Sequence, residues 1–226
     1  MLCLLIAFRT QNAHLPSGHF ELYEKAVDYL IVTHPSRRRE ASRLEGRPFQ
    51  LQNDELRSIF AHLALTIQER EPSGIIADRD AREAVVSYLV SPNGRFAMGQ
   101  REANQIADAL LQIADDTTGL VVRKSPSHIG FFHRAFGEFL AAWQLSETGF
   151  EAQLPVVNAR CCDPQWHEVL LCLFARTTRP TEIARFVDEI QRSARRRMDQ
   201  PSSVDGVVGT TEGFERPISQ SWKGLF

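Results

Sequence analysis

The stretch "IGFFHRAFGEFLAAW", residues 129–143, joins a short run of large apolar residues to a histidine, an arginine and an amphipathic segment. In its second half the apolar residues recur at intervals of three and four, which predicts a helix over 134–145. That stripe consists of Phe136, Phe139, Leu140 and Trp143. Upstream, β-branched and aromatic residues flank the turn "SPS" at 125–127, which predicts a hairpin within 121–132. His133 stands where the hairpin ends and the helix begins.

Three more amphipathic segments precede the hairpin and predict helices that begin at residue 53, at residue 79 and at residue 101. The first is the most regular, and Asn53 or Asp54 is its expected N-cap. Its apolar stripe is Leu56, Ile59, Phe60, Leu63, Ala64 and Ile67. Three helices, a β-hairpin wing and a closing helix describe a winged helix over 53–146.

Helical segments are expected on both sides of this unit, so the fold class is mainly α. "FELYEKAVDYLI" predicts a helix that ends near Pro35, and the arginine-rich stretch 35–52 is typical of a linker. After a loop containing Pro155, an αα-hairpin is expected over 164–194, with Asp163 as its cap and a break at Pro180. Its second helix should bury Ile183, Phe186, Val187 and Ile190. The predicted divisions are 1–34, 35–52, 53–146, 147–194 and a tail at 195–226 without a hydrophobic period, which we expect to be disordered.

The composition is typical of a globular protein with a small net charge. The chain has 226 residues, 43% of them hydrophobic, and 26 basic against 28 acidic residues give a net charge of −2. That balance provides no general attraction to nucleic acid or to anionic membranes. Four cysteines without a CxxC pair predict a reduced, cytoplasmic protein, and the apolar start "MLCLLIAF" lacks the charged region of a signal peptide.

The sequence offers no catalytic constellation, so we expect this chain not to be an enzyme. The string "GRFAMGQR" has Gly94 and Gly99 but places Gln100 where a phosphate-binding loop needs lysine. Cys161, Cys162 and His167 lie close in sequence but lack the ligand spacing of a metal site. No metal is therefore expected.

The opening stretch resembles the end of the winged helix in NACHT-type NTPases, which belong to the STAND class of signalling ATPases. In that family a Phe-x-His block runs into a helix with a start similar to "FGEFLAA". The segments "LPSGHFELYEKAVDYLI" and "DPQWHEVLLCLFA" resemble, in the right order, a helix after the NTPase core and the first helix of the helical repeats. The resemblance covers roughly residues 1–175.

The resemblance implies a division of labour between this chain and another part of the protein. Residues 1–34 would be the end of the NACHT core, and 147–194 the start of a HEAT-like helical repeat. Since the chain has neither a Walker A loop nor a Walker B strand, it resembles the C-terminal portion of such a protein. The implied partner is the missing NTPase portion, in cis or as a separate chain, and the full-length protein is expected to be able to self-oligomerise.

The resemblance also implies a role for His133. The family histidine at this position contacts the β-phosphate of a bound ADP and holds the inactive state. ADP or ATP is thus expected only in the complete NACHT module, and no cofactor is expected for the isolated chain. The residues alone leave open a second role for His133, a core or capping histidine. Gly137 departs from the family pattern, which has Gln there, and a glycine weakens a helix by about 1 kcal/mol.

Two other functions remain as alternatives at this point. One is a DNA-binding winged-helix regulator, and the other is a non-catalytic helical scaffold. DNA binding is disfavoured by the third helix, where Arg101 is outnumbered by Glu102, Asp108, Asp115 and Asp116. Neither nucleic acid nor a membrane is therefore an expected partner.

Overall fold

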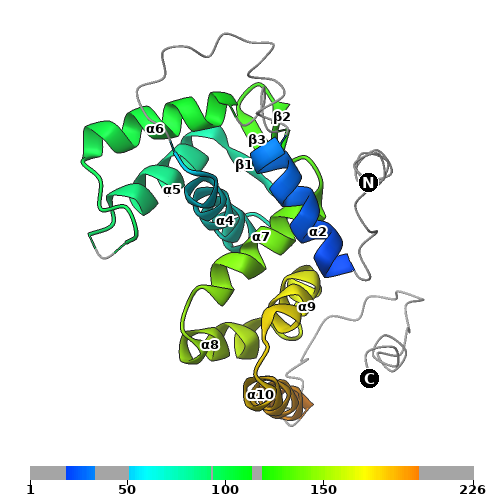
Figure 1. Cartoon of the computed structure of the whole chain (residues 1–226). Helices are drawn as coiled ribbons and strands as arrows, with labels where there is room; N and C mark the ends of the chain where they lie inside the picture. Colours follow the sequence, from blue (N-terminus) through cyan, green and yellow to red (C-terminus); the bar gives the residue numbers. More distant parts are fainter. Residues whose placement is uncertain (1–18, 34–50, 93, 114–118, 199–226) are drawn as a thin grey trace, which may run out of the picture.

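A computed structural model describes residues 19–33, 51–92, 94–113 and 119–198. Most of the predicted linker, 35–50, and almost all of the predicted tail lie outside the described residues, as does the start of the 1–34 segment. The elements, in chain order, are α2 His19–Asp28, the π-helix η1 Tyr29–Thr33, α4 Asn53–Arg70, β1 Ile75–Ala77, α5 Asp78–Val90, α6 Gln100–Ile113, β2 Val121–Ser125, β3 His128–Phe131, α7 Arg134–Ser146, α8 Phe150–Arg160, the short 3-10 helix η3 Pro164–Trp166, α9 His167–Arg176 and α10 Pro180–Met198 (Figure 1).

The winged helix is confirmed. Helices α4, α5 and α6 are followed by the β2–β3 hairpin and by α7, as predicted. Helix α4 packs along α7, and the apolar stripes of both helices enter one core that also takes in α2. Leu56 and Trp143 are the exceptions in these two stripes, since both are only partly buried at the edge of this core.

The N-cap predicted for α4 is wrong by one or two residues. Gln52 is the cap, and its backbone N–H donates to the Oε2 of Glu55 at 2.7 Å. A glutamate three residues into a helix reaches back to the cap, which satisfies a donor that would otherwise have no partner. Asp54 instead pairs with Arg95 from the α5–α6 connection, and this bond holds the pKa of Asp54 below its usual value.

The wing has three strands, where the sequence predicted two. β1 pairs with β3, and β3 pairs with β2, all antiparallel. At Gly130 of β3 an added Cβ would lie only 2.7 Å from the carbonyl oxygen of Gly74, so β1 and its turn approach closely because residue 130 has no side chain. A three-residue strand has too little periodicity to be predicted from sequence.

The region around Pro155 is helical, which corrects the predicted loop. Pro155 is the sixth residue of α8, where it removes one backbone hydrogen bond without stopping the helix. Asp163 is confirmed as a cap, since its Oδ1 accepts the N–H of Gln165 at 3.0 Å. The last helix begins at Pro180 as expected and continues to Met198, beyond the predicted end at 194.

Helix α10 packs chiefly on α8 and helix α9 chiefly on α7, so the two helices expected as an αα-hairpin make their main contacts with other helices. The ring of Phe186 lies 4.8 Å from that of Phe150 on α8 and 4.9 Å from that of Phe174 on α9. Ile183 and Val187 were expected inside but are each 40% exposed, because the contact with α8 lies to one side of the predicted stripe. None of the described helices combines the length and the apolar character needed to cross a bilayer.

Candidate functional site

His133 is the N-cap of α7 and lies directly after β3. Its backbone is extended, with φ −123° and ψ 133°, and the N–H of Ala135 donates to its Nδ1 at 3.3 Å. The side chain is exposed to solvent. An imidazole in this position replaces the hydroxyl or carboxylate that usually accepts the first free N–H groups of a helix.

The capping bond determines which ring nitrogen carries the proton. Nδ1 can accept the N–H of Ala135 only through its lone pair, so the neutral ring carries its hydrogen on Nε2. Nε2 is then a hydrogen-bond donor on an exposed ring. The cap and a donor at Nε2 therefore coexist in one tautomer.

Buried aromatic residues on both sides hold this junction in place. Phe131 ends β3 in the core, and Phe136 is buried on the first turn of α7 with its ring centroid 5.9 Å from that of His133. Between them the chain alternates, so Phe132 is 60% exposed and lies on the outer side together with His133. A rigid strand-to-helix junction therefore presents an aromatic ring and an imidazole to solvent.

A hollow of about 210 Å³ lies beside the junction. Phe132, just after β3, lines it together with Arg134 and Glu138 of α7, and residues 72–75 line it from the other side. The Nε of Arg134 donates to the Oε1 of Glu138 at 2.8 Å, which pairs a carboxylate whose residue is only 8% exposed. His133 is not among the lining residues, so the hollow borders the imidazole without containing it.

Gly137, where the sequence departs from the family pattern, has a packing role. A Cβ at this position would lie 3.0 Å from the Cδ2 of Phe131. The buried ring of Phe131 thus occupies the space that a side chain at 137 would need. The helix-weakening residue lets α7 pack closely on the end of β3.

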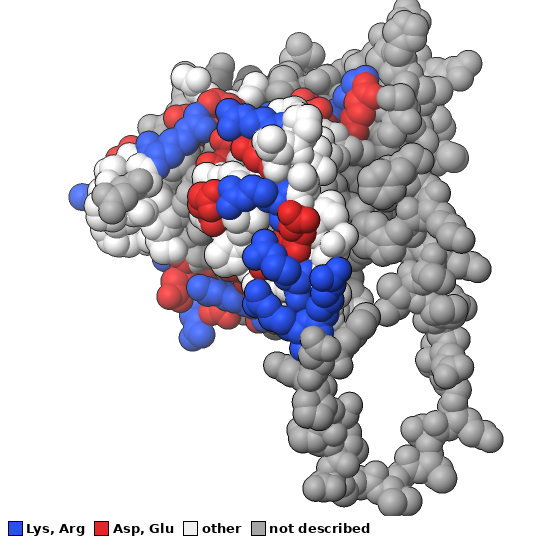
Figure 2. All heavy atoms as spheres, turned by 90° about the horizontal axis from the view of Figure 1, so that it is seen from below, with Lys and Arg blue, Asp and Glu red and all other residues white. Residues whose placement is uncertain are grey.

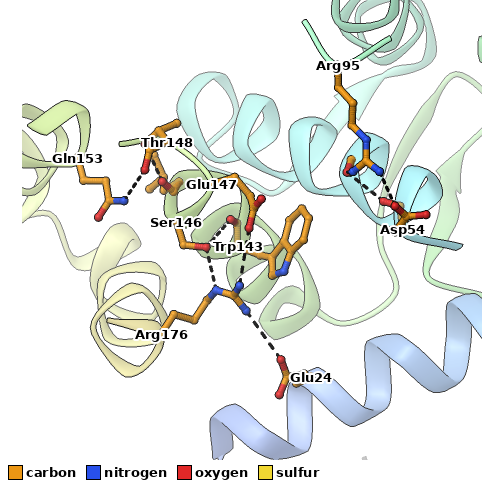
Figure 3. A network of polar contacts seen from close by, with 11 residues as sticks. Glu24, Asp54, Arg95, Trp143, Ser146, Glu147, Thr148, Gln153 and Arg176 are labelled. Atoms are coloured by element: carbon orange, nitrogen blue, oxygen red, sulfur yellow. Dashed lines mark hydrogen bonds and ion pairs between the residues drawn. The ribbon is translucent and has the colours of Figure 1, made fainter. Parts of the chain in front are cut away.

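A second polar cluster joins the winged helix to the elements on either side of it (Figure 3). Arg176 at the end of α9 donates from Nε to the Oγ of Ser146 at 2.8 Å, and it forms longer ion pairs with Glu24 of α2 at 3.8 Å and Glu147 at 3.9 Å. Its guanidinium also lies over the ring of Trp143. Sequence reasoning missed this cluster, because its members are up to about 150 positions apart and no local pattern connects them.

A metal site is absent from the part of the chain that the structure describes. No group of three or more His, Cys, Asp or Glu side chains there could hold an ion. His167 does not join the two neighbouring cysteines but has its Nδ1 3.9 Å from the Oε1 of Glu168.

The surface expected to face DNA in a DNA-binding winged helix is largely occupied by internal ion pairs. Arg123 on the wing contacts the Oδ2 of Asp78 at 2.6 Å, and Arg82 contacts Asp108 of α6 at 2.5 Å. Figure 2 shows basic and acidic side chains interspersed over much of one face, with basic ones gathered near one edge. Helix α10, on this side of the molecule, exposes Arg192, Arg195 and Arg196 near its C-terminal end, where cations interact favourably with the helix dipole.

Comparison with known proteins agrees with the geometry of this fold. The model of a family described as the winged helix-turn-helix domain C-terminal to NACHT matches residues 19–145, which is more than half of the chain. Comparison with curated proteins and with solved structures returned no significant match.

Proposed function

Because the chain belongs to the family of winged helix-turn-helix domains C-terminal to NACHT, we propose that it is the regulatory, nucleotide-sensing part of a NACHT-type signalling ATPase. In this proposal His133 holds the ADP-bound, inactive arrangement. Helix α2, which packs on α7, belongs to the end of the NACHT core, and α8 to α10 begin a helical repeat. The parent protein would carry the ATPase activity, and this chain would not be an enzyme by itself.

The observation that carries the proposal is the bond from the N–H of Ala135 to the Nδ1 of His133. This bond leaves the proton of the neutral ring on Nε2, at the exposed edge of a junction held by buried phenylalanines. An N–H aimed at a phosphate oxygen forms a charge-assisted hydrogen bond, which is stronger than a neutral one. A capping bond and a phosphate contact therefore suit the same tautomer, and the two roles considered for His133 are compatible.

Regulation follows if His133 contacts the nucleotide in only one arrangement of the domains. A contact made only in the closed arrangement stabilises it by the free energy of that contact. The isolated chain should bind ADP or ATP very weakly, because the backbone amides and the lysine of a phosphate-binding loop are not in its sequence. Its partner is then the NTPase portion, in cis or as a second chain. The proposal includes self-oligomerisation of the complete protein and a cytoplasmic location.

Two substitutions distinguish the capping role of His133 from its contact with phosphate. Both are made in a protein in which this chain is joined to its NTPase portion. His133→Ala removes both contacts, whereas His133→Ser keeps a good helix cap but cannot reach a phosphate. We expect both variants to weaken ADP binding by about 10- to 150-fold, the equivalent of about 1.5–3 kcal/mol for a hydrogen bond to a charged group. Calorimetric titration with ADP measures this change.

The matched variant also defines the result against the proposal. If His133→Ser bound ADP as tightly as the unsubstituted protein and only His133→Ala weakened binding, then His133 would be a structural cap alone. Denaturant unfolding of the two variants provides the control. Only His133→Ala should lose about 1 kcal/mol of stability through the cap.

A further inference from the structure

Two neighbouring thiols, Cys161 and Cys162, lie at the C-terminal end of α8. Their Sγ atoms are 3.7 Å apart. Cys162 is exposed and Cys161 is partly exposed, so a small reagent can reach the pair. Both residues lie outside 19–145, the part of the chain that the family model matches.

The turn that carries the thiols is held on both sides. The N–H of Cys161 donates to the carbonyl of Val157 at 2.9 Å, and the N–H of Asp163 donates to the carbonyl of Arg160 at 2.9 Å. Arg160 stacks on the buried ring of Trp166, with its guanidinium 5.0 Å from the ring centroid. The backbone that carries the two sulfurs is thus ordered before any ligand arrives, which lowers the entropic cost of binding one atom with both.

The separation of the sulfurs suits a bridging atom better than a direct disulfide. Two thiolates bound to one soft atom at about 2.3 Å lie about 3.4–3.8 Å apart for bond angles between about 95° and the tetrahedral value. A direct disulfide usually joins Cα atoms at least about 4.4 Å apart, whereas neighbouring residues hold theirs at about 3.8 Å. The pair is therefore better placed to chelate than to oxidise to an S–S bond.

The surroundings limit what such an atom can be. No third His, Cys, Asp or Glu side chain joins the pair within the described residues. The pair therefore does not provide the ligands for an ion that needs three or four of them from the protein. A monosubstituted trivalent arsenical needs only two sulfurs. It exchanges its oxo group for two thiolates, and the two thiol protons leave with the oxygen as one water, with no change of oxidation state.

We propose that Cys161 and Cys162 form a two-sulfur binding site for trivalent arsenicals. Binding closes a ring through the peptide bond between the two cysteines, in the turn between α8 and η3. The site lies outside the junction at His133 and does not depend on the role proposed for that residue. Cys172 on α9 is 5% exposed and serves as an internal comparison, because its thiol is out of reach of the reagent.

The test uses the full reduced chain and phenylarsine oxide, with intact-mass spectrometry in the presence of excess glutathione. We expect one phenylarsenic unit per chain, retained against glutathione and removed by dithiothreitol. A second bond to the same arsenic forms intramolecularly and should strengthen retention about 100-fold or more over a single thiol. Cys161→Ser and Cys162→Ser should each abolish the retained adduct, while Cys172→Ala and Cys3→Ser should leave it unchanged.

Three results would overturn the proposal. These are no retained adduct on the unsubstituted chain, an adduct that survives in Cys161→Ser or Cys162→Ser, and an adduct lost in Cys172→Ala or Cys3→Ser. Far-UV circular dichroism of each variant establishes that it is folded, and both serine substitutions are at exposed or partly exposed positions where folding tolerates them.

Discussion

Arg176 on α9 stacks on Trp143 of α7, with its guanidinium carbon 5.7 Å from the ring centroid. Arg57 of α4 lies 6.0 Å from the same ring and pairs with Asp28 at the end of α2. Two cations from different elements thus share one indole, and each also contacts a carboxylate of the α2 helix. The winged helix, the segment before it and the helices after it meet at this ring.

Replacing Arg176 should therefore weaken the joint between these parts. Arg176→Ala removes the bond to Ser146 and the cation–π contact, and we expect the free energy of unfolding to fall by about 1–3 kcal/mol. Arg176→Lys should recover only part of this loss, because an ammonium cannot stack and pair at once as the planar guanidinium does. Urea denaturation followed by tryptophan fluorescence measures both variants.

Arg179→Ala is the matched control for that experiment. Arg179 pairs with Glu182 at 3.1 Å, but its side chain is 77% exposed. Exposed pairs of this kind contribute about 0–1 kcal/mol, so the free energy of unfolding should hardly change. An equal loss in the Arg176 and Arg179 variants would contradict a specific role for Arg176.

Gly130→Ala should destabilise the three-stranded sheet. The added methyl group would lie 2.7 Å from the carbonyl oxygen of Gly74, so β1 and its turn must move away from β3. Such overpacking costs about 1–3 kcal/mol, measurable as a lower free energy of unfolding. Gly99→Ser serves as the comparison, because nothing lies within 4 Å of a Cβ built there. A Gly130→Ala variant as stable as Gly99→Ser would argue against the close approach.

Stability should fall as the pH rises above 9, through Cys172. Burial, assisted by Glu168 and Glu138, raises the pKa of this thiol from 9.0 to about 12. Between these values the unfolded chain loses the thiol proton while the folded chain keeps it, so unfolding is favoured as the pH rises. One such proton changes the free energy of unfolding by about 1.4 kcal/mol per pH unit.

Cys172→Ala isolates that contribution from the other groups that titrate in the same range. Tyr23 and Tyr88 also have raised pKa values, caused mainly by burial, and they lower stability in the same direction at still higher pH. Urea titrations at several pH values from 8 to 11 should give a flatter profile for the variant. Identical profiles would show that the thiol of Cys172 ionises as easily in the folded chain as in the unfolded one.

The isolated chain should bind duplex DNA weakly and without sequence preference. Arg123 is engaged by Asp78 on the wing, and Asp108 on α6 is engaged by Arg82, so the usual DNA-contacting elements offer few free cations. Any binding should then weaken steeply with added salt. Fluorescence anisotropy with unrelated duplexes at two salt concentrations tests this expectation. A salt-resistant complex with one sequence would favour a DNA-binding regulator instead.

The sequence alone was sufficient for the helices of the winged helix and for their order. In α4 and α7 the apolar residues recur with the helical period, and this local signal defines the buried face before any partner is known. The turn residues at 125–127 likewise specified the β2–β3 hairpin. The motif around His133 was sufficient to indicate the family, because an aromatic block, a histidine and an amphipathic helix lie next to one another in the chain.

Tertiary structure decided what depends on residues far apart in the chain. β1 is too short to be recognised alone and exists through pairing with β3, which requires Gly130. Pro155 lies within a helix because packing of α8 against α10 compensates for a lost hydrogen bond. The meeting of Arg176 with Trp143 and Glu24 depends on how three helices pack, and the hydrogen bond that sets the tautomer of His133 depends on the exact start of α7. Periodicity encodes which face of a helix is buried, but only packing brings the separate faces together.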